Sequence, residues 1–199
     1  MDNITKLLAL EEIRHLKALY THYTDQKNSK DWAELFTEDC VVEMRDCLTP
    51  KHPITGKVLP VRGFDSEWLT KQLSSIAWPL RGKAQVGKFH RDALGNSGLQ
   101  AGQAGVDQGE EVCISTQHGC FNSVLEITSD STATGIWPTR VFAQYADASP
   151  LNRVWFTCNY HETYEKVKER WLIKSLRLEV LWIDAWGPGD LDRGSNLRS

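Results

Sequence analysis

Hydrophobic residues near the N-terminus recur at helical spacing. Ile13, Leu16, Tyr20 and Tyr23 are three or four residues apart, so they fall on one face of an amphipathic helix. The pair Asn28–Ser29 is expected to end this helix. The sequence therefore predicts an N-terminal helix that buries one apolar face.

A second, shorter apolar pattern follows at once. Ser29 is placed to cap a helix with the sequence KDWAELF, in which Trp32, Leu35 and Phe36 are expected to be buried. The run CVVEM at residues 40–44 predicts a short strand.

The middle of the chain has the weakest pattern. Residues 48–62 hold three prolines among polar residues and predict a loop. A helix is expected at residues 65–76, whereas residues 81–111 show little periodicity and predict a long loop, a candidate lid. We therefore expect residues 48–111 to be a variable insertion with one helix and a long loop.

The second half is rich in β-branched and aromatic residues. Its strand-like runs are VCISTQHGCF, SVLEIT, TATGIWPTRVFAQY, RVWFTCNYHETYEKV and RWLIKSLRLEVLWID. The sequence KVKER predicts a tight hairpin, and Pro138 indicates an edge strand or a bulge. Helices followed by antiparallel strands predict one α+β domain over residues 1–199, with the helices packed on a curved sheet and a flexible tail at residues 187–199.

Apolar residues occupy both phases of the last strand. Leu176, Leu178 and Val180 alternate with positions that include Leu181 and Ile183. This predicts a sheet that is covered by helices on one face and by a partner subunit or the tail on the other.

Composition narrows the classes of function. The net charge of −3 and the absence of a basic stripe argue against nucleic acid, and no apolar run reaches membrane-spanning length. The N-terminus does not resemble a secretory signal, and the five cysteines include no CxxC motif. We expect a cytoplasmic protein with free thiols, no metal and no cofactor.

Three segments resemble the SnoaL-like branch of the NTF2-like superfamily. They are EEIRHLKALYTHYTDQKNSKDWAELFTEDCVVEM, HGCFNSVLEITSDSTATGIW and NYHETYEKVKERWLIKSLRLEVLWID, within residues 9–47 and 112–184. The resemblance implies a cone-shaped α+β barrel with a deep hydrophobic pocket, usually in a homodimer or homotrimer packed through the sheet. Relatives include scytalone dehydratase, bile acid 7α-dehydratase, polyketide cyclases and non-catalytic proteins, so the fold alone does not settle function.

The resemblance also implies a catalytic set. In the family's dehydratases a Tyr and an Asp lie on or after the first helix and a His lies on a strand; Tyr20, Asp25 and His118 match these positions. Their chemistry is removal of a proton next to a carbonyl, followed by loss of a hydroxyl as water. His118 would be the general base, or else a structural histidine in an apolar strand.

Helical geometry separates the candidates near residue 20. Tyr20 lies on the apolar face, either with its hydroxyl in the pocket or as a core tyrosine. Asp25 lies about 140° round from Tyr20, so the two share a pocket only if the helix ends or loosens first. His22 faces away, toward solvent or a subunit contact, and Tyr23 is expected to line the pocket or pack in the core.

Strand alternation does not decide which residues of the run NYHETY face the interior. Asn159 and His161 share one face of their strand, and Tyr160 and Glu162 share the other. One of these faces must look inward. Asn159 and His161 are therefore candidate substrate-binding residues.

The run GIWPTRVF departs from the family. Relatives often carry Glu-Asp shortly after the Trp, where this chain has Arg140 and Val141. Arg140 is a candidate for binding a carboxylate, enolate or phenolate oxygen, or else an outward-facing strand residue. Trp137 is a candidate pocket residue, and several tryptophans in the pocket would indicate a large, flat, apolar ligand.

These observations predict a cofactor-independent enzyme. It would act on a hydrophobic, oxygenated molecule such as a polyketide, terpenoid or steroid-like intermediate by dehydration, cyclisation or isomerisation. The alternative is a non-catalytic binding or partner protein of the same fold, and convergence of Tyr20, Asp25 and His118 would distinguish the two. A metal site built from Asp25, His118 and His161 is a weaker hypothesis without a spacing signature.

Overall fold

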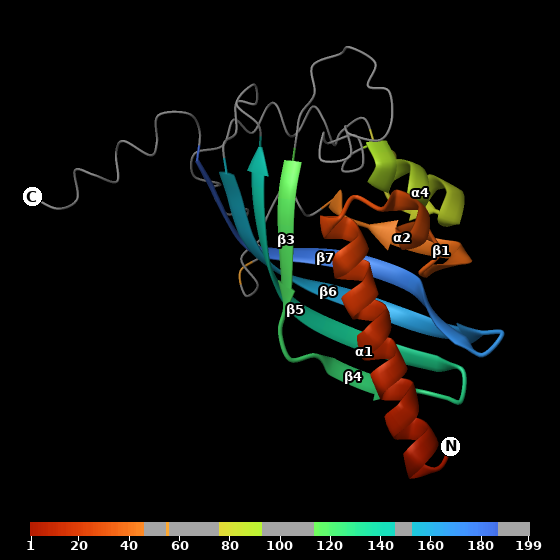
Figure 1. Cartoon of the computed structure of the whole chain (residues 1–199). Coiled ribbons are helices and arrows are strands. Elements are labelled where there is room, and N and C mark those ends of the chain that lie inside the picture. The colour runs from red at the N-terminus through yellow and green to blue at the C-terminus, as the bar shows by residue number, and fades with distance from the viewer. Residues whose placement is uncertain (46–54, 56–75, 93–113, 146–152, 187–199) are drawn as a thin grey trace, which may run out of the picture.

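A long N-terminal helix lies across the concave face of a strongly curved sheet (Figure 1). The computed structural model describes residues 1–45, 55, 76–92, 114–145 and 153–186. The expected loop at 48–62, the expected helix at 65–76 and the tail at 187–199 lie almost wholly outside these residues. In the described part of the chain, no helix is both long enough and apolar enough to cross a membrane.

Helix α1 (Asn3–Asp25) has the predicted apolar face. Its buried residues are Ala9, Ile13, Leu16, Lys17, Tyr20 and Thr24. The Asp2 side chain caps the helix by accepting hydrogen bonds from the backbone amides of Ile4 and Thr5. The helix ends at Asp25, so the predicted face is confirmed and the helix stops slightly before the expected position.

Helix α2 (Ser29–Ala33) follows, with Trp32, Leu35 and Phe36 buried as predicted. The N-cap is Asn28, whose side-chain oxygen accepts from the Asp31 amide, so the prediction of Ser29 as the cap is wrong by one residue. The expected helix also ends early, because Phe36 already belongs to strand β1 (Phe36–Glu43).

The expectation of a loop from residue 81 is wrong at its start. Strand β2 (Leu80–Arg81) leads into helix α4 (Lys83–His90), which buries Val86 and His90 one turn apart. Gly87 interrupts the helical pattern of the sequence, which is why the helix was not predicted. A Cβ at Gly87 would lie 3.1 Å from the Ala33 Cβ. The glycine lowers helix propensity while allowing α4 to pack closely on α2.

The described strands form a seven-stranded, unclosed sheet. The remaining strands are β3 (Ile114–Cys120), β4 (Val124–Ile127), β5 (Thr132–Tyr145), β6 (Arg153–Val167) and β7 (Arg170–Trp186). The order is β2-β1-β7-β6-β5-β3, with β4 also paired to β5. All pairs are antiparallel except β1 with β7. The α+β class and the curved, mostly antiparallel sheet are therefore confirmed.

The predictions for the β6–β7 hairpin and for Pro138 have different outcomes. The β6–β7 hairpin is confirmed, with Lys168 and Glu169 at φ 48° and 66° in the turn. Of the two alternatives for Pro138, the edge strand is wrong, because β5 is paired on both sides. Pro138 lies where the partner of β5 changes from β4, whose first residue, Val124, pairs with Ile136, to β3, whose last residue, Cys120, pairs with Thr139. Residues 121–123 there face only residues 137 and 138 of β5, as in a bulge. The missing proline N–H therefore falls at a junction in the ladder.

The convex face of the sheet keeps exposed apolar side chains. Ile136, Trp155 and Trp182 are exposed there, opposite the face that contacts α1. Apolar residues thus occupy both faces, as predicted. The partner subunit that was expected to cover this face stays a prediction.

Gly135 makes room for a buried tyrosine, and this gives a testable expectation. A Cβ at Gly135 would lie 2.8 Å from Leu125 Cδ2 and 3.1 Å from the Tyr164 hydroxyl. We expect Gly135→Ala to lower the free energy of unfolding by about 1–3 kcal/mol through overpacking, as measured by urea denaturation. Gly119→Ala is the matched control, because its Cβ would meet only the Arg140 carbonyl oxygen at 3.8 Å. Equal costs at the two strand glycines would contradict this account.

Candidate active site

The interior of the cone is lined by alternate residues of β3, β5 and β6. Thr116, His118 and Cys120 of β3 point to the same side, because residues two apart in a strand share a face. Helix α1 packs against β3 on that side, and its last residue, Asp25, reaches His118. The end of the helix and the middle of β3 therefore meet at one point.

Asp25 and His118 form a closely held pair. The Asp25 Oδ1 lies 2.6 Å from the His118 Nδ1, and the Asp25 Oδ2 accepts from the His118 backbone amide at 3.0 Å. The Thr116 hydroxyl also donates to Asp25 Oδ1 at 3.0 Å. The side chains are 8% exposed for His118 and 25% for Asp25. The pair is thus fixed by three hydrogen bonds and largely shielded from water.

The hydrogen bonds set the protonation of Asp25. Burial raises the pKa of Asp25, but the hydrogen bonds and charge of His118, helped by Thr116, outweigh it and hold the pKa below its usual value. Asp25 is therefore a carboxylate that only accepts, and the Nδ1 of His118 donates to it. Among the described residues, none makes a hydrogen bond to the Nε2 of His118. This leaves Nε2 as the proton-accepting atom of the neutral imidazole.

Two further polar residues adjoin the pair. Lys27 is buried just beyond α1, with its Nζ 2.5 Å from the Thr116 Oγ1. His90 of α4 is also buried; it stacks on Trp32, and its Nδ1 lies 2.8 Å from the Ser29 Oγ. Burial, with added effects from the charges of Lys27 and His118, lowers the pKa of His90 to about 3. His90 is thus neutral at physiological pH.

A second polar cluster lies deeper in the cone. Lys17 Nζ lies 2.5 Å from Glu162 Oε1, and the two side chains are 1% and 0% exposed. The other Glu162 oxygen accepts from the Tyr164 hydroxyl, which in turn accepts from Trp137 Nε1 at 2.6 Å. The Lys17 ammonium also lies over the rings of Tyr160, at 3.7 Å, and Tyr20, at 4.1 Å. The buried ammonium is therefore compensated by a carboxylate and two aromatic faces.

Comparison with known proteins places the chain in a family. The sequence model described as "SnoaL-like domain" matches residues 5–66 and 74–177. The chain belongs to the SnoaL-like domain family. No curated protein sequence matches it.

Solved structures share this SnoaL-like fold at low sequence identity. A candidate scytalone dehydratase from Novosphingobium aromaticivorans is 16% identical, with TM-score 0.60 over 94% of this chain and 93% of that one. Hexachlorocyclohexane dehydrochlorinase LinA-type3 from Novosphingobium barchaimii is 11% identical, with TM-score 0.60 over 92% and 94%. ActVI-ORFA from Streptomyces coelicolor is 14% identical, with TM-score 0.54 over 86% and 96%. At these identities the likeness establishes the fold.

Tyr20 faces the interior of the SnoaL-like cone but stands apart from the Asp25–His118 pair. Its ring lies 5.3 Å from that of Trp32 and 5.7 Å from that of Tyr160, between centroids. Burial and the negative charge of Glu162 raise the pKa of Tyr20 well above its usual value, so its hydroxyl keeps its proton. Asp25 and His118 converge as predicted, whereas Tyr20 packs in the aromatic core.

The other predicted residues of α1 and β5 divide between core and surface. Tyr23 is partly buried against the core, His22 is exposed as predicted, and Trp137 faces the interior. Arg140 is exposed on the convex face, with its guanidinium 5.5 Å from the Phe121 ring centroid and 5.7 Å from that of Trp155.

Of the two alternatives for Arg140, the outward-facing strand residue is therefore confirmed and the oxygen-binding pocket residue is wrong. Arg140 pairs in register with Gly119 and Thr157, which share its outward face. The neighbouring positions, Thr139 and Val141, are the buried ones.

The predictions for Asn159 and His161 are also wrong. His161 Nε2 lies 2.8 Å from Glu179 Oε2, and the Asn159 amide donates to the same oxygen at 3.3 Å. These contacts lie on the convex face, because Tyr160 and Glu162 take the buried face of β6. His118 and His161 are thus on opposite sides of the sheet. The metal set of Asp25, His118 and His161 does not converge, and the described residues contain no other candidate group of three.

Sequence reasoning missed Lys17 and Glu162. Lys17 lies four residues after Ile13 and three before Tyr20, which puts a charge on the apolar face of α1. Glu162 likewise alternates with Tyr160 and Tyr164. A lysine and a glutamate at two core-facing positions were the signal for a buried ion pair.

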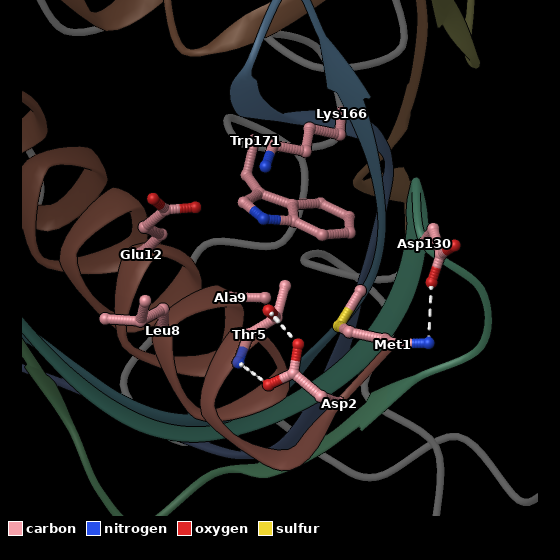
Figure 2. Close-up of a pocket in the computed structure, with 9 residues that line it drawn as sticks. All are labelled: Met1, Asp2, Thr5, Leu8, Ala9, Glu12, Asp130, Lys166 and Trp171. Atoms are coloured by element: carbon pink, nitrogen blue, oxygen red, sulfur yellow. Dashed lines mark hydrogen bonds and ion pairs between the residues drawn. The ribbon is translucent and has the colours of Figure 1, made fainter.

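A separate hollow lies at the other end of α1. It encloses about 410 Å³ and is lined by Met1, Asp2, Thr5, Leu8, Ala9, Glu12, Asp130, Lys166 and Trp171. Figure 2 shows the Trp171 ring facing the first turns of α1, with the Met1 amino group directed at Asp130. Asp25 and His118 are not among its lining residues.

Proposed function

We propose that this chain is a cofactor-independent enzyme that removes a proton from a hydrophobic, oxygenated small molecule. His118 is the general base, Asp25 orients it, and the reaction is a dehydration, a cyclisation or an isomerisation. The observation that carries the proposal is the 2.6 Å contact between Asp25 Oδ1 and His118 Nδ1, which leaves Nε2 to accept a proton.

The proposed chemistry begins with a carbon acid. Nε2 takes a proton from the carbon next to a carbonyl. The electron pair of that C–H bond forms a C=C bond while the π pair of the carbonyl moves onto its oxygen, which gives an enolate. The imidazolium is stabilised by the Asp25 carboxylate. In a dehydration the enolate re-forms the carbonyl as the C–O bond of the neighbouring carbon breaks, and the departing hydroxyl takes the proton from the imidazolium and leaves as water. In an isomerisation another carbon of the substrate takes the proton, and in a cyclisation the enolate carbon attacks a second carbonyl, whose oxygen takes it.

The proposed substrate is hydrophobic and carries rings. Trp137, Tyr160 and Tyr164 are buried core residues on the face of the sheet that α1 covers, so a pocket that opens among them would have aromatic walls. Such surface favours flat, apolar molecules, which is why a polyketide, terpenoid or steroid-like intermediate is proposed. The names of two structural neighbours, a candidate dehydratase and a dehydrochlorinase, also denote eliminations. We place the enzyme in secondary metabolism, in the cytoplasm, as a homodimer or homotrimer.

Deuterium exchange tests the proposal whichever of the three reactions the enzyme catalyses. The protein is incubated in D2O with a panel of aromatic and alicyclic β-hydroxy ketones, and mass spectrometry follows deuterium uptake and loss of water. We expect uptake next to the carbonyl in at least one compound, abolished in His118→Ala. Loss of water with uptake indicates a dehydratase, and uptake without it indicates an isomerase or cyclase.

A non-catalytic binding protein is the second candidate. Two observations favour it: Arg140 faces outward, and Tyr20 packs in the aromatic core away from Asp25 and His118. In the same experiment it would bind members of the panel, as seen by tryptophan fluorescence, while exchanging no proton in any of them.

A further inference from the structure

The turn after α1 has a lysine where glycine is usually found. The amide of Asn28 donates to the Tyr23 carbonyl at 2.9 Å and that of Lys27 to the Thr24 carbonyl at 3.2 Å, the pattern of a Schellman motif. Its left-handed position is Lys27, at φ 60°. Glycine adopts this conformation without strain, whereas a lysine destabilises the turn. The chain therefore keeps lysine here at a cost to the stability of the turn.

The side chain of Lys27 reaches the Asp25–His118 pair. Lys27 is 2% exposed, and its Nζ lies 2.5 Å from Thr116 Oγ1. Because an ammonium group only donates, Thr116 Oγ1 must accept from it. The single hydroxyl proton of Thr116 is then left for Asp25 Oδ1, 3.0 Å away. Lys27 thus fixes the direction of the Thr116–Asp25 hydrogen bond.

The positive charge of Lys27 lies among few other titratable groups near His118 in the described part of the chain. Among the residues that the structure describes, the titratable groups near the imidazole are Asp25 at the end of α1, Lys27 just beyond it, His90 of α4 and Cys120 on β3 itself. His90 is neutral at physiological pH, and its lowered pKa already reflects the positive charge of Lys27. Lys27 is thus a buried cation that is linked to the Asp25 carboxylate through the Thr116 hydroxyl.

We propose that Lys27 is a positioning residue of the Asp25–His118 pair, which orders Asp25 through Thr116 and uses its positive charge to keep His118 neutral and able to accept a proton. This rests on the proposed role of the pair in proton transfer. Without Lys27, His118 would take up a proton at a higher pH. Removing the positive charge of Lys27 and loosening the Thr116–Asp25 hydrogen bond would each favour the imidazolium. The enzyme would then lose its base near neutrality.

The test is an NMR titration of His118 in protein labelled with 15N-histidine. In Lys27→Met we expect the midpoint of the His118 titration to move up by about one pH unit relative to the unmodified protein. Lys27→Arg keeps the charge and is expected to keep the midpoint. Lys30→Met is the matched control, because Lys30 is exposed on α2 three residues away and should leave the midpoint unchanged.

A second variant guards against misfolding of Lys27→Met. Thr116→Val removes the bridging hydroxyl while Lys27 stays, and we expect an upward shift of about half a pH unit, absent in Thr116→Ser. Shifts in Lys27→Met or Thr116→Val that exceed those of their controls support the inference. It is overturned if each folded variant titrates like its control.

The titration needs no substrate, so it is independent of the proposed reaction. An unchanged midpoint in a protein that exchanges substrate protons would overturn the role of Lys27 alone. A shifted midpoint in a protein that exchanges none would support the coupling of Lys27 to His118 and overturn the catalytic proposal.

Discussion

Replacing Glu162 by Gln is expected to lower the free energy of unfolding by about 3–5 kcal/mol. The substitution keeps the shape of the side chain but removes the charge that faces Lys17 at 2.5 Å. Lys17 is 1% exposed, so its ammonium cannot turn to water without moving α1 away from the sheet. Urea denaturation at pH 7 measures the loss.

Two further variants separate the pair from ordinary surface charge. Glu165→Gln, three residues along β6, removes a carboxylate whose partner Lys174 is accessible to water, and should cost about 1 kcal/mol or less. The double variant Lys17→Met with Glu162→Leu leaves no unpaired buried charge and should regain much of the loss. If Glu162→Gln cost no more than Glu165→Gln, the buried pair would not have the energetic role given to it here.

Replacing His118 by Ala is expected to reduce turnover of the substrate found by deuterium exchange by about a hundredfold or more, since general base catalysis contributes that much. Asp25→Asn should also lose at least tenfold, because an amide can offer its N–H to Nδ1 and reverse the tautomer that leaves Nε2 free to accept. Steady-state rates and circular dichroism are measured together, so that a loss of activity can be separated from a loss of fold.

His161→Ala is the matched control for this series. His161 also pairs with a carboxylate, Glu179 at 2.8 Å, but on the convex face of the sheet. We expect turnover to be unchanged within about twofold, in keeping with the small effects of substitutions far from a site. A loss in His161→Ala comparable to that in His118→Ala would show that the candidate site is on the wrong face.

The sequence predicted the parts of the fold where pattern and burial agree. The apolar face of α1, the buried Trp32 and the hairpin after β6 follow from spacing and turn chemistry, and the structure contains all three. Helix α4 was not predicted, because the glycines at 82 and 87 weaken the helical pattern of a short segment. Its stability comes from packing on α2, which a local pattern does not contain.

The face of β6 could not be chosen from its residues. Asn159 and His161 alternate with Tyr160 and Glu162, and histidine is a more usual buried residue than glutamate. The structure reverses this order because Lys17 of α1 lies opposite Glu162 and compensates its charge. Lys17, which is 145 residues away from Glu162 in the chain, therefore determines which face of β6 is buried. The pairing of Asp25 with His118 was anticipated through family resemblance, whereas Lys27 was not.

The position of Asp25 at the last turn of α1 links the proposed catalysis to folding. Asp25 and His118 are 93 residues apart in the chain, one on the helix and one on the sheet. Contacts between such distant segments form late and depend on the whole topology. The proposed base is therefore assembled only when the helix has docked in the cone. If the proposed activity exists, undocking of the helix end alone would abolish it while every strand remained paired. Loss of activity would then measure the separation of the helix end from β3 rather than unfolding of the sheet.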